Sequence, residues 1–175
     1  TLPTVNAVQV ALSGSYDCFL AQVPDTGASL LTSTYLGGAN SDFCYALTVD
    51  GAGNPILAGS SASTNFPVTP GVYQPARGGS YDAVLAKWNA ANSVDWATYL
   101  GGTSSDCANV VYIDTDGAVC AAGHTQSSNF PTMDPVQSTL GGVVDGFLSC
   151  VDSTATGLPF STYLGRADED RILGV

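Results

Sequence analysis

Aspartate is the residue type in this chain with the most capacity for chemistry. All of its 15 acidic residues but Glu169 are Asp, and only four Lys and Arg oppose them, so the formal net charge is −11. Two carboxylates held roughly 5–9 Å apart in a cleft can hydrolyse glycosidic bonds, and clustered oxygen donors can bind calcium. A surface this acidic repels phosphate, which argues against a nucleic-acid partner and an anionic membrane surface.

Two short loops bring oxygen donors together. Asp50 opens the first loop, which runs to Asn54, and Asp114 and Asp116 lie in the second. Neither follows the twelve-residue calcium loop that ends in a bidentate Glu. Aspartates in such loops more often accept backbone N–H groups and so stabilise turns. We therefore expect no cofactor, and keep calcium-dependent adhesion as an alternative with Asp114 and Asp116 as the candidate ligands.

His124 is the single histidine of the chain, and Asp168 and Asp170 belong to a short acidic run near the end. A metal site generally needs more than one His or Cys ligand, and a serine triad needs a strained turn such as G-x-S-x-G, which is absent. The pattern favours a loop histidine after a strand and a solvated acidic loop, with no catalytic residue. A polysaccharide-acting enzyme with an acidic cleft near these three residues remains the alternative.

The five cysteines contain no C-x-x-C pair, so neither a zinc ribbon nor a thioredoxin-like site is expected. Their number is odd, so at least one thiol is free or pairs with another chain. The sequence does not decide between disulfides and buried free thiols, and it selects no connectivity among Cys18, Cys44, Cys107, Cys120 and Cys150.

Trp88 and Trp96 flank one predicted hairpin. They are candidates for an exposed sugar-binding platform, but burial between packed sheets is the favoured interpretation because large aromatic side chains dominate protein cores.

The elements that position these residues follow an internal repeat. Tyr35, Tyr99 and Tyr163 are 64 residues apart and belong to the strings STYLGG, ATYLGG and STYLGR. Other positions recur with the same or nearly the same spacing: Asp17, Asp82 and Asp145; Asp42, Asp106 and Asp170; Asp50 and Asp114; Phe66 and Phe130. Residues that every copy needs are expected to serve turns and packing, so these Asp, Tyr and Phe residues are predicted to be structural.

Each copy contains four short β-rich runs bounded by Gly, Asp and Asn, followed by a longer connection that contains Pro. In the first copy the runs are 19–23, 31–36, 43–49 and 56–59, and in the second they are 83–88, 94–100, 110–113 and 118–123. Lys and Glu, which normally cover exposed helix faces, occur once each, so helical bundles are excluded. A four-stranded antiparallel meander repeated in series predicts an all-β chain of β-propeller blades.

The repeat divides the chain into four parts of one propeller segment. Residues 1–16 are the end of a preceding copy, 17–81 the first copy, 82–144 the second, and 145–175 the first half of a third. This makes about 2.7 copies, whereas closed propellers have about 4–8 blades. We therefore expect a piece of a longer propeller, a unit that assembles head-to-tail, or one unit of an open filament.

These motifs resemble the bacterial SBBP repeat family, named for a seven-bladed β-propeller. The resemblance is carried by D-x-F-L-A at 17–21, STYLGG at 33–38, Asp42, V-D-x-x-G-N at 49–54, A-G at 58–59, and N-F-P-x-T-P-G-x-Y-Q at 65–74. The second copy departs from the last motif at 133–137, and the third has Arg166 in place of the second Gly. The resemblance implies an exported or surface propeller that binds or scaffolds, and implies neither an enzyme nor a particular ligand.

The expected function is that of a non-enzymatic extracellular or cell-surface module for protein or surface interaction, scaffolding, or head-to-tail assembly. Its expected partners are other copies of the chain, the rest of a longer propeller, or surface glycans or proteins. Membrane insertion is not expected, because no stretch approaches the ~18 consecutive apolar residues of a membrane span.

Overall fold

The computed structural model describes residues 2–174, which form ten β-strands and no helix. The strands are β1 (Cys18–Gln22), β2 (Thr32–Leu36), β3 (Asp42–Val49), β4 (Pro55–Ser61), β5 (Asp82–Trp88), β6 (Val94–Leu100), β7 (Asp106–Ile113), β8 (Val119–Thr125), β9 (Asp145–Val151) and β10 (Phe160–Leu164). The prediction of an all-β chain of blade-like antiparallel meanders is confirmed. No helix within 2–174 is long and apolar enough to cross a membrane.

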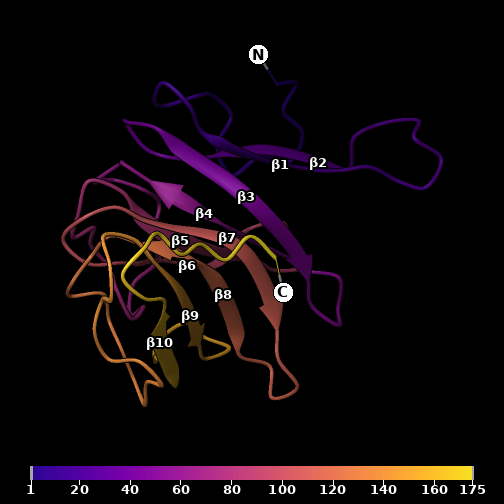
Figure 1. Cartoon of the computed structure of the whole chain (residues 1–175). Coiled ribbons are helices and arrows are strands. Elements are labelled where there is room, and N and C mark those ends of the chain that lie inside the picture. The colour runs from indigo at the N-terminus through magenta and orange to yellow at the C-terminus, as the bar shows by residue number, and fades with distance from the viewer. Residues whose placement is uncertain (1, 175) are drawn as a thin grey trace.

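The strands form three antiparallel sheets that follow one another through the molecule (Figure 1). The half sheet contains β1 and β2, the first complete sheet runs β3-β4-β5-β6, and the second complete sheet runs β7-β8-β9-β10. Strands adjacent in the sequence are adjacent in each sheet, which is the meander that the turn spacing predicts.

The sheets are out of phase with the sequence repeat. β4 pairs with β5 from Ile56 opposite Lys87 to Ser61 opposite Asp82, so the first complete sheet joins the second half of one copy to the first half of the next. The expectation that the four runs of a single copy form one meander was therefore wrong. A repeat period is the same whichever four consecutive strands form a sheet, so the spacing alone could not reveal this phase.

The predicted strand positions agree closely with the structure, with one informative exception. The run expected at 110–113 is the end of β7, which begins at Asp106 and contains a bulge between Ala108 and Val110. β3 has the matching irregularity between Cys44 and Ala46. A bulge inserts an extra residue and breaks the alternation of apolar and polar side chains, so the start of β7 was missed.

The two complete sheets pack face to face through an apolar core. Leu85 and Trp96 contribute to it from the first complete sheet, and Phe147, Val151 and Tyr163 from the second. The indole Nε1 of Trp96 also donates a hydrogen bond across this interface to the carbonyl oxygen of Ser153, at 3.0 Å. This is the blade-to-blade packing expected of propeller repeats.

A second core joins the half sheet to the first complete sheet. Leu20 and Leu36 meet Val84, Trp88 and Tyr99 there. Trp88 and Trp96 are only 1% and 4% exposed, which confirms their predicted burial and excludes an exposed tryptophan platform.

The recurrent tyrosines and phenylalanines pack as predicted. The tyrosines also hold the loops that follow β4 and β8, the second strands of the two complete sheets. The ring centroids of Phe66 and Tyr99 are 5.9 Å apart, and Tyr99 accepts the Phe66 N–H while donating to the carbonyl oxygen of Ser63. Tyr163 makes the same contacts with Phe130 and Ser127.

We expect these tyrosines to make the fold sensitive to alkali. Burial raises the pKa of both Tyr99 and Tyr163 above the value of about 10 for a free phenol. The folded chain therefore keeps protons that the unfolded chain releases, so the contribution of these tyrosines to the free energy of unfolding is complete below pH ~10 and declines as the pH rises above that value.

Chemical unfolding of wild type at pH 9 and pH 11 should show this loss of stability. Tyr99→Phe should be less stable at pH 9 by about 1–3 kcal/mol and should lose less between the two values. An equal loss in both proteins would contradict the assignment.

The long connections cover the last strand of each sheet. The Tyr99 N–H on β6 donates to the carbonyl oxygen of Gln74, and the Tyr163 N–H on β10 donates to that of Gln137. The Tyr35 N–H on β2 donates in the same way to Gln9. The surplus length of this repeat thus protects strand edges that would otherwise be free to pair.

Candidate functional site

The first set of recurrent aspartates is Asp17, Asp82 and Asp145, and each binds the long connection that comes just before it in the sequence. Asp82 accepts hydrogen bonds from the N–H groups of Gly78 and Gly79 at 2.8 and 2.9 Å and from Gln74 Nε2 at 2.7 Å. The Oε1 of Gln74 in turn accepts the Gly101 N–H at 2.9 Å. The same contacts recur for Asp17 with Gln9 and for Asp145 with Gln137. Each carboxylate therefore fixes a loop to the end of its own sheet.

The second set lies at the start of β3 and β7. Asp106 is fully buried and accepts hydrogen bonds from the Gly102 N–H at 2.8 Å, from Ser127 Oγ at 2.9 Å and from Thr125 Oγ1. Burial raises the pKa of Asp106, and these hydrogen bonds oppose the rise. Asp42 makes the corresponding contacts in the preceding copy. These aspartates hold turns and loops, as their recurrence predicts.

The calcium candidates lie in the β7–β8 turn. Asp114 Oδ1 accepts the N–H groups of Asp116 and Ala118 at 3.0 and 2.8 Å, which is ordinary turn stabilisation. Across residues 2–174 no group of three or more His, Cys, Asp or Glu side chains is placed to hold a metal ion. Calcium binding by Asp114 and Asp116 stays a prediction.

His124 lies within β8 and not in a loop after a strand, so that part of the prediction was wrong. Asn109 on the neighbouring β7 places its Nδ2 3.3 Å from His124 Nδ1, and the same Nδ2 donates to the carbonyl oxygen of Ile172 at 2.9 Å. Burial, together with the charge of Arg171, lowers the pKa of His124. His124 and Asn109 thus lie under the C-terminal segment and help to hold it against the second complete sheet.

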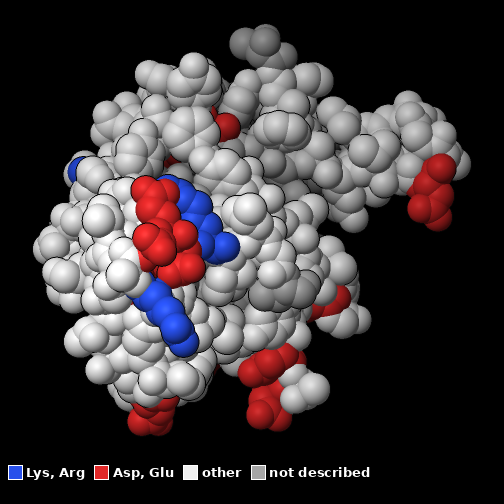
Figure 2. Space-filling model, viewed as in Figure 1, with Lys and Arg blue, Asp and Glu red and all other residues white. Residues whose placement is uncertain are grey.

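The acidic run near the C-terminus is paired locally. Asp170 accepts the Arg166 N–H at 2.8 Å, and Glu169 forms an ion pair with Arg171 at 3.5 Å. Figure 2 shows acidic and basic side chains side by side on this face, with further acidic groups spread over separate loop tips. His124, Asp168 and Asp170 do not line the cavity that opens on the second complete sheet beside Tyr112 and Phe160.

Four of the five cysteines form two disulfides. Cys18–Cys44 joins β1 of the half sheet to β3 of the first complete sheet, whereas Cys120–Cys150 joins neighbouring strands of the second complete sheet. Cys107 is the buried cysteine left free within 2–174, as the odd number predicts. Burial raises the pKa of its thiol to about 11, so the sulfur is protonated at neutral pH and is a poor nucleophile.

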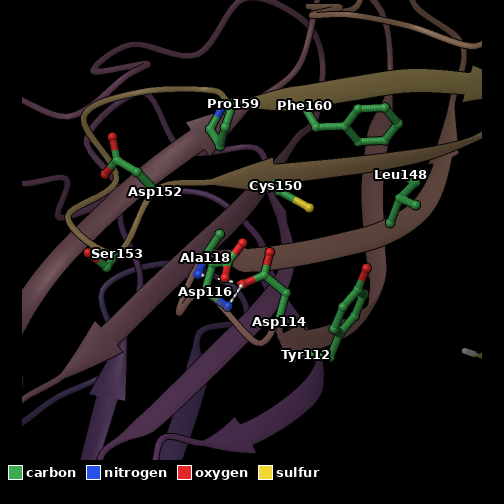
Figure 3. A pocket seen from close by; sticks show the side chains of 10 residues that line it. All are labelled: Tyr112, Asp114, Asp116, Ala118, Leu148, Cys150, Asp152, Ser153, Pro159 and Phe160. Atoms are coloured by element: carbon green, nitrogen blue, oxygen red, sulfur yellow. Dashed lines mark hydrogen bonds between the residues drawn. The ribbon is translucent and has the colours of Figure 1, made fainter.

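A cavity of about 560 Å³ opens on the second complete sheet (Figure 3). Tyr112, Leu148 and Phe160 provide apolar walls, and Asp114 and Asp116 lie beside them on the β7–β8 turn. The sequence pattern indicates the two aspartates but not the walls, because the wall side chains come from three strands and share no sequence motif.

Comparison with known proteins agrees with this architecture. Residues 33–67, which span β2, β3, β4 and the start of the following connection, match the family model SBBP, described as a beta-propeller repeat. No curated protein matches the chain. The fold is therefore that of a β-propeller-type repeat protein. Within it, residues 33–67 form an SBBP-type repeat, which confirms the resemblance predicted from the motifs for that segment.

Proposed function

We propose that this chain is a non-enzymatic, extracellular or cell-surface propeller module that assembles with other copies of itself through the edge of β1. The observation that carries the proposal is the pairing of β1. β5 pairs with both β4 and β6, and β9 pairs with both β8 and β10, whereas within residues 2–174 β1 pairs with β2 alone.

The side chains around this edge also favour association. Phe19 on β1 is 60% exposed, and Tyr16 and Val23 at either end of the strand are exposed too. An open strand edge supplies unpaired backbone groups, and exposed apolar side chains beside it add the driving force to bury them. Pairing with the same edge of a second copy would join two half sheets into one four-stranded sheet.

Two further features support the remaining parts of the proposal. The disulfides Cys18–Cys44 and Cys120–Cys150 fit an oxidising compartment outside the cytoplasm. The recurrent carboxylates already accept hydrogen bonds that hold turns and loops, as Asp82 and Asp106 do, and such fully engaged groups favour a structural role over acid–base catalysis.

We expect Phe19→Lys to weaken self-association, because it puts a charge on the strand edge that must pair. Light scattering on the size-fractionated chain over a range of concentrations measures the effect. Wild type should move from the mass of one chain toward multiples of it as concentration rises, and Phe19→Lys should stay at one chain over the same range.

The matched control is Val136→Lys, which puts the same charge at another exposed apolar side chain, 82% exposed and outside the strands. It should associate like wild type. A wild-type chain that stays monomeric at every concentration, or a Val136→Lys variant impaired as much as Phe19→Lys, would contradict assembly through β1.

A further inference from the structure

The cavity on the second complete sheet corresponds to a position that a lysine side chain fills on the first. Lys87 on β5 lies opposite Ile56 on β4. In the second complete sheet, Cys150 on β9 lies opposite Cys120 on β8. Both pairs involve the equivalent strands and the equivalent rung of the ladder, so Cys150 occupies the place of Lys87.

The lysine of the first complete sheet neutralises a turn carboxylate. Lys87 Nζ lies 3.1 Å from Asp50 Oδ2, and both side chains are 18% exposed. Asn54 Nδ2 donates to the same oxygen at 2.9 Å. Hydrogen bonds from Asn54, with a further contribution from Lys87, hold the pKa of Asp50 well below its usual range.

The corresponding carboxylate of the second complete sheet has neither partner. Asp114 opens the turn after β7 as Asp50 does after β3, and its Oδ1 accepts two N–H groups of that turn. Its Oδ2 accepts no hydrogen bond from residues 2–174. An alanine, Ala118, stands where Asn54 would be, and a disulfide-bonded cysteine stands where Lys87 would be.

The space left beside Asp114 is the cavity of about 560 Å³. Figure 3 shows Tyr112, Leu148 and Phe160 among the residues that line it, with one carboxyl oxygen of Asp114 in the hydrogen bonds of the turn and the other pointing away from them. Apolar walls suit the methylene stem of a long amine, and aromatic rings attract a cation placed near their faces. The first complete sheet already pairs an ammonium with the equivalent turn carboxylate, Lys87 with Asp50.

We propose that this cavity binds a primary alkylammonium group, with Asp114 Oδ2 as its counter-ion and the apolar walls around its methylene stem. The net charge of −11 favours the approach of such a cation. A lysine side chain of a partner segment and a free polyamine share this chemistry, and the probes below distinguish the two sources.

Isothermal titration calorimetry of the intact chain with pentylamine tests the proposal, with 1-pentanol as the uncharged probe of similar length. Pentylamine should bind saturably and pentanol should not. Asp114→Asn should weaken pentylamine binding by about fivefold, the upper end for a solvent-accessible ion pair. The variant should keep the turn, because Asn89 Oδ1 accepts the Ala91 N–H at 2.9 Å in the same kind of turn.

Asp25→Asn is the matched control, since it removes one negative charge from an exposed turn that does not line the cavity. Its affinity for pentylamine should equal that of wild type. A second variant, Cys120→Ile with Cys150→Lys, restores the pair of the first complete sheet and should abolish binding by filling the cavity with its own lysine.

Titrations with a lysine blocked at both its backbone ends and with spermidine identify the source of the amine. Tighter binding of the blocked lysine assigns a protein segment, and tighter binding of spermidine assigns a free polyamine. The proposal is overturned if pentylamine does not bind saturably or if pentanol binds as tightly as pentylamine. It is also overturned if Asp114→Asn and Asp25→Asn have the same affinity for pentylamine.

Discussion

Replacing Asp106 by alanine should lower the free energy of unfolding by about 3–5 kcal/mol, a large effect for a single substitution. The carboxylate is fully buried and accepts hydrogen bonds from Gly102, Thr125 and Ser127. Alanine would leave these donors without a partner inside the protein, and unmet buried polar groups are costly. Denaturant unfolding monitored by tryptophan fluorescence is the measurement.

Asp25→Ala serves as the control, because Asp25 is exposed and lies outside this recurrent set. It should change the stability by less than about 0.5 kcal/mol. Equal stabilities for Asp106→Ala and Asp25→Ala would show that the recurrent aspartates do not hold the loops in place.

Removing the Cys18–Cys44 disulfide by substituting both residues with alanine should cost about 3–4 kcal/mol. The disulfide spans a sequence separation of 26 residues, and closing a loop of this size restricts the unfolded chain by about that amount. Alanine fits both places, because Ala83 and Ala108 occupy the equivalent positions in the next copy and are fully buried.

The location of this disulfide also predicts which part of the molecule responds. It ties the half sheet to the first complete sheet, so the double variant should lose protection against proteolysis in β1 and β2 before the other strands unfold. The double variant Cys120→Ala, Cys150→Ala is the comparison, since its disulfide lies within one sheet. Preferential cleavage of the half sheet in that comparison variant alone would contradict the assignment.

Much of this fold could be predicted because the same physical need recurs in each copy. The glycine N–H groups of each long connection require an acceptor such as Asp82, and the last strand of each complete sheet carries a tyrosine such as Tyr99 that holds the loop between the two middle strands. These needs leave identical residues about 64 positions apart. The grouping of strands into sheets could not be read in this way, because the pairing of Ile56 with Lys87 joins two copies and has no signature in either.

The candidate site was predictable only in part. Asp114 could be predicted because two aspartates in a short turn that contains Gly place several oxygen donors close together. Tyr112, Leu148 and Phe160 did not, since alternating apolar residues look alike whether the facing surface is covered or open. The apolar run that ends at Gly123 predicts a loop at His124, yet β8 continues through that glycine to Thr125.

Amide hydrogen exchange in β1 tests the central claim, assembly through this edge, most directly. At low protein concentration the amides of Cys18–Gln22 that do not pair with β2 should exchange quickly, while those of β5, which pairs on both sides, should be protected. Raising the concentration should slow exchange in β1 of wild type but not of Phe19→Lys. Exchange in β1 that stays equally fast at every concentration would contradict the account.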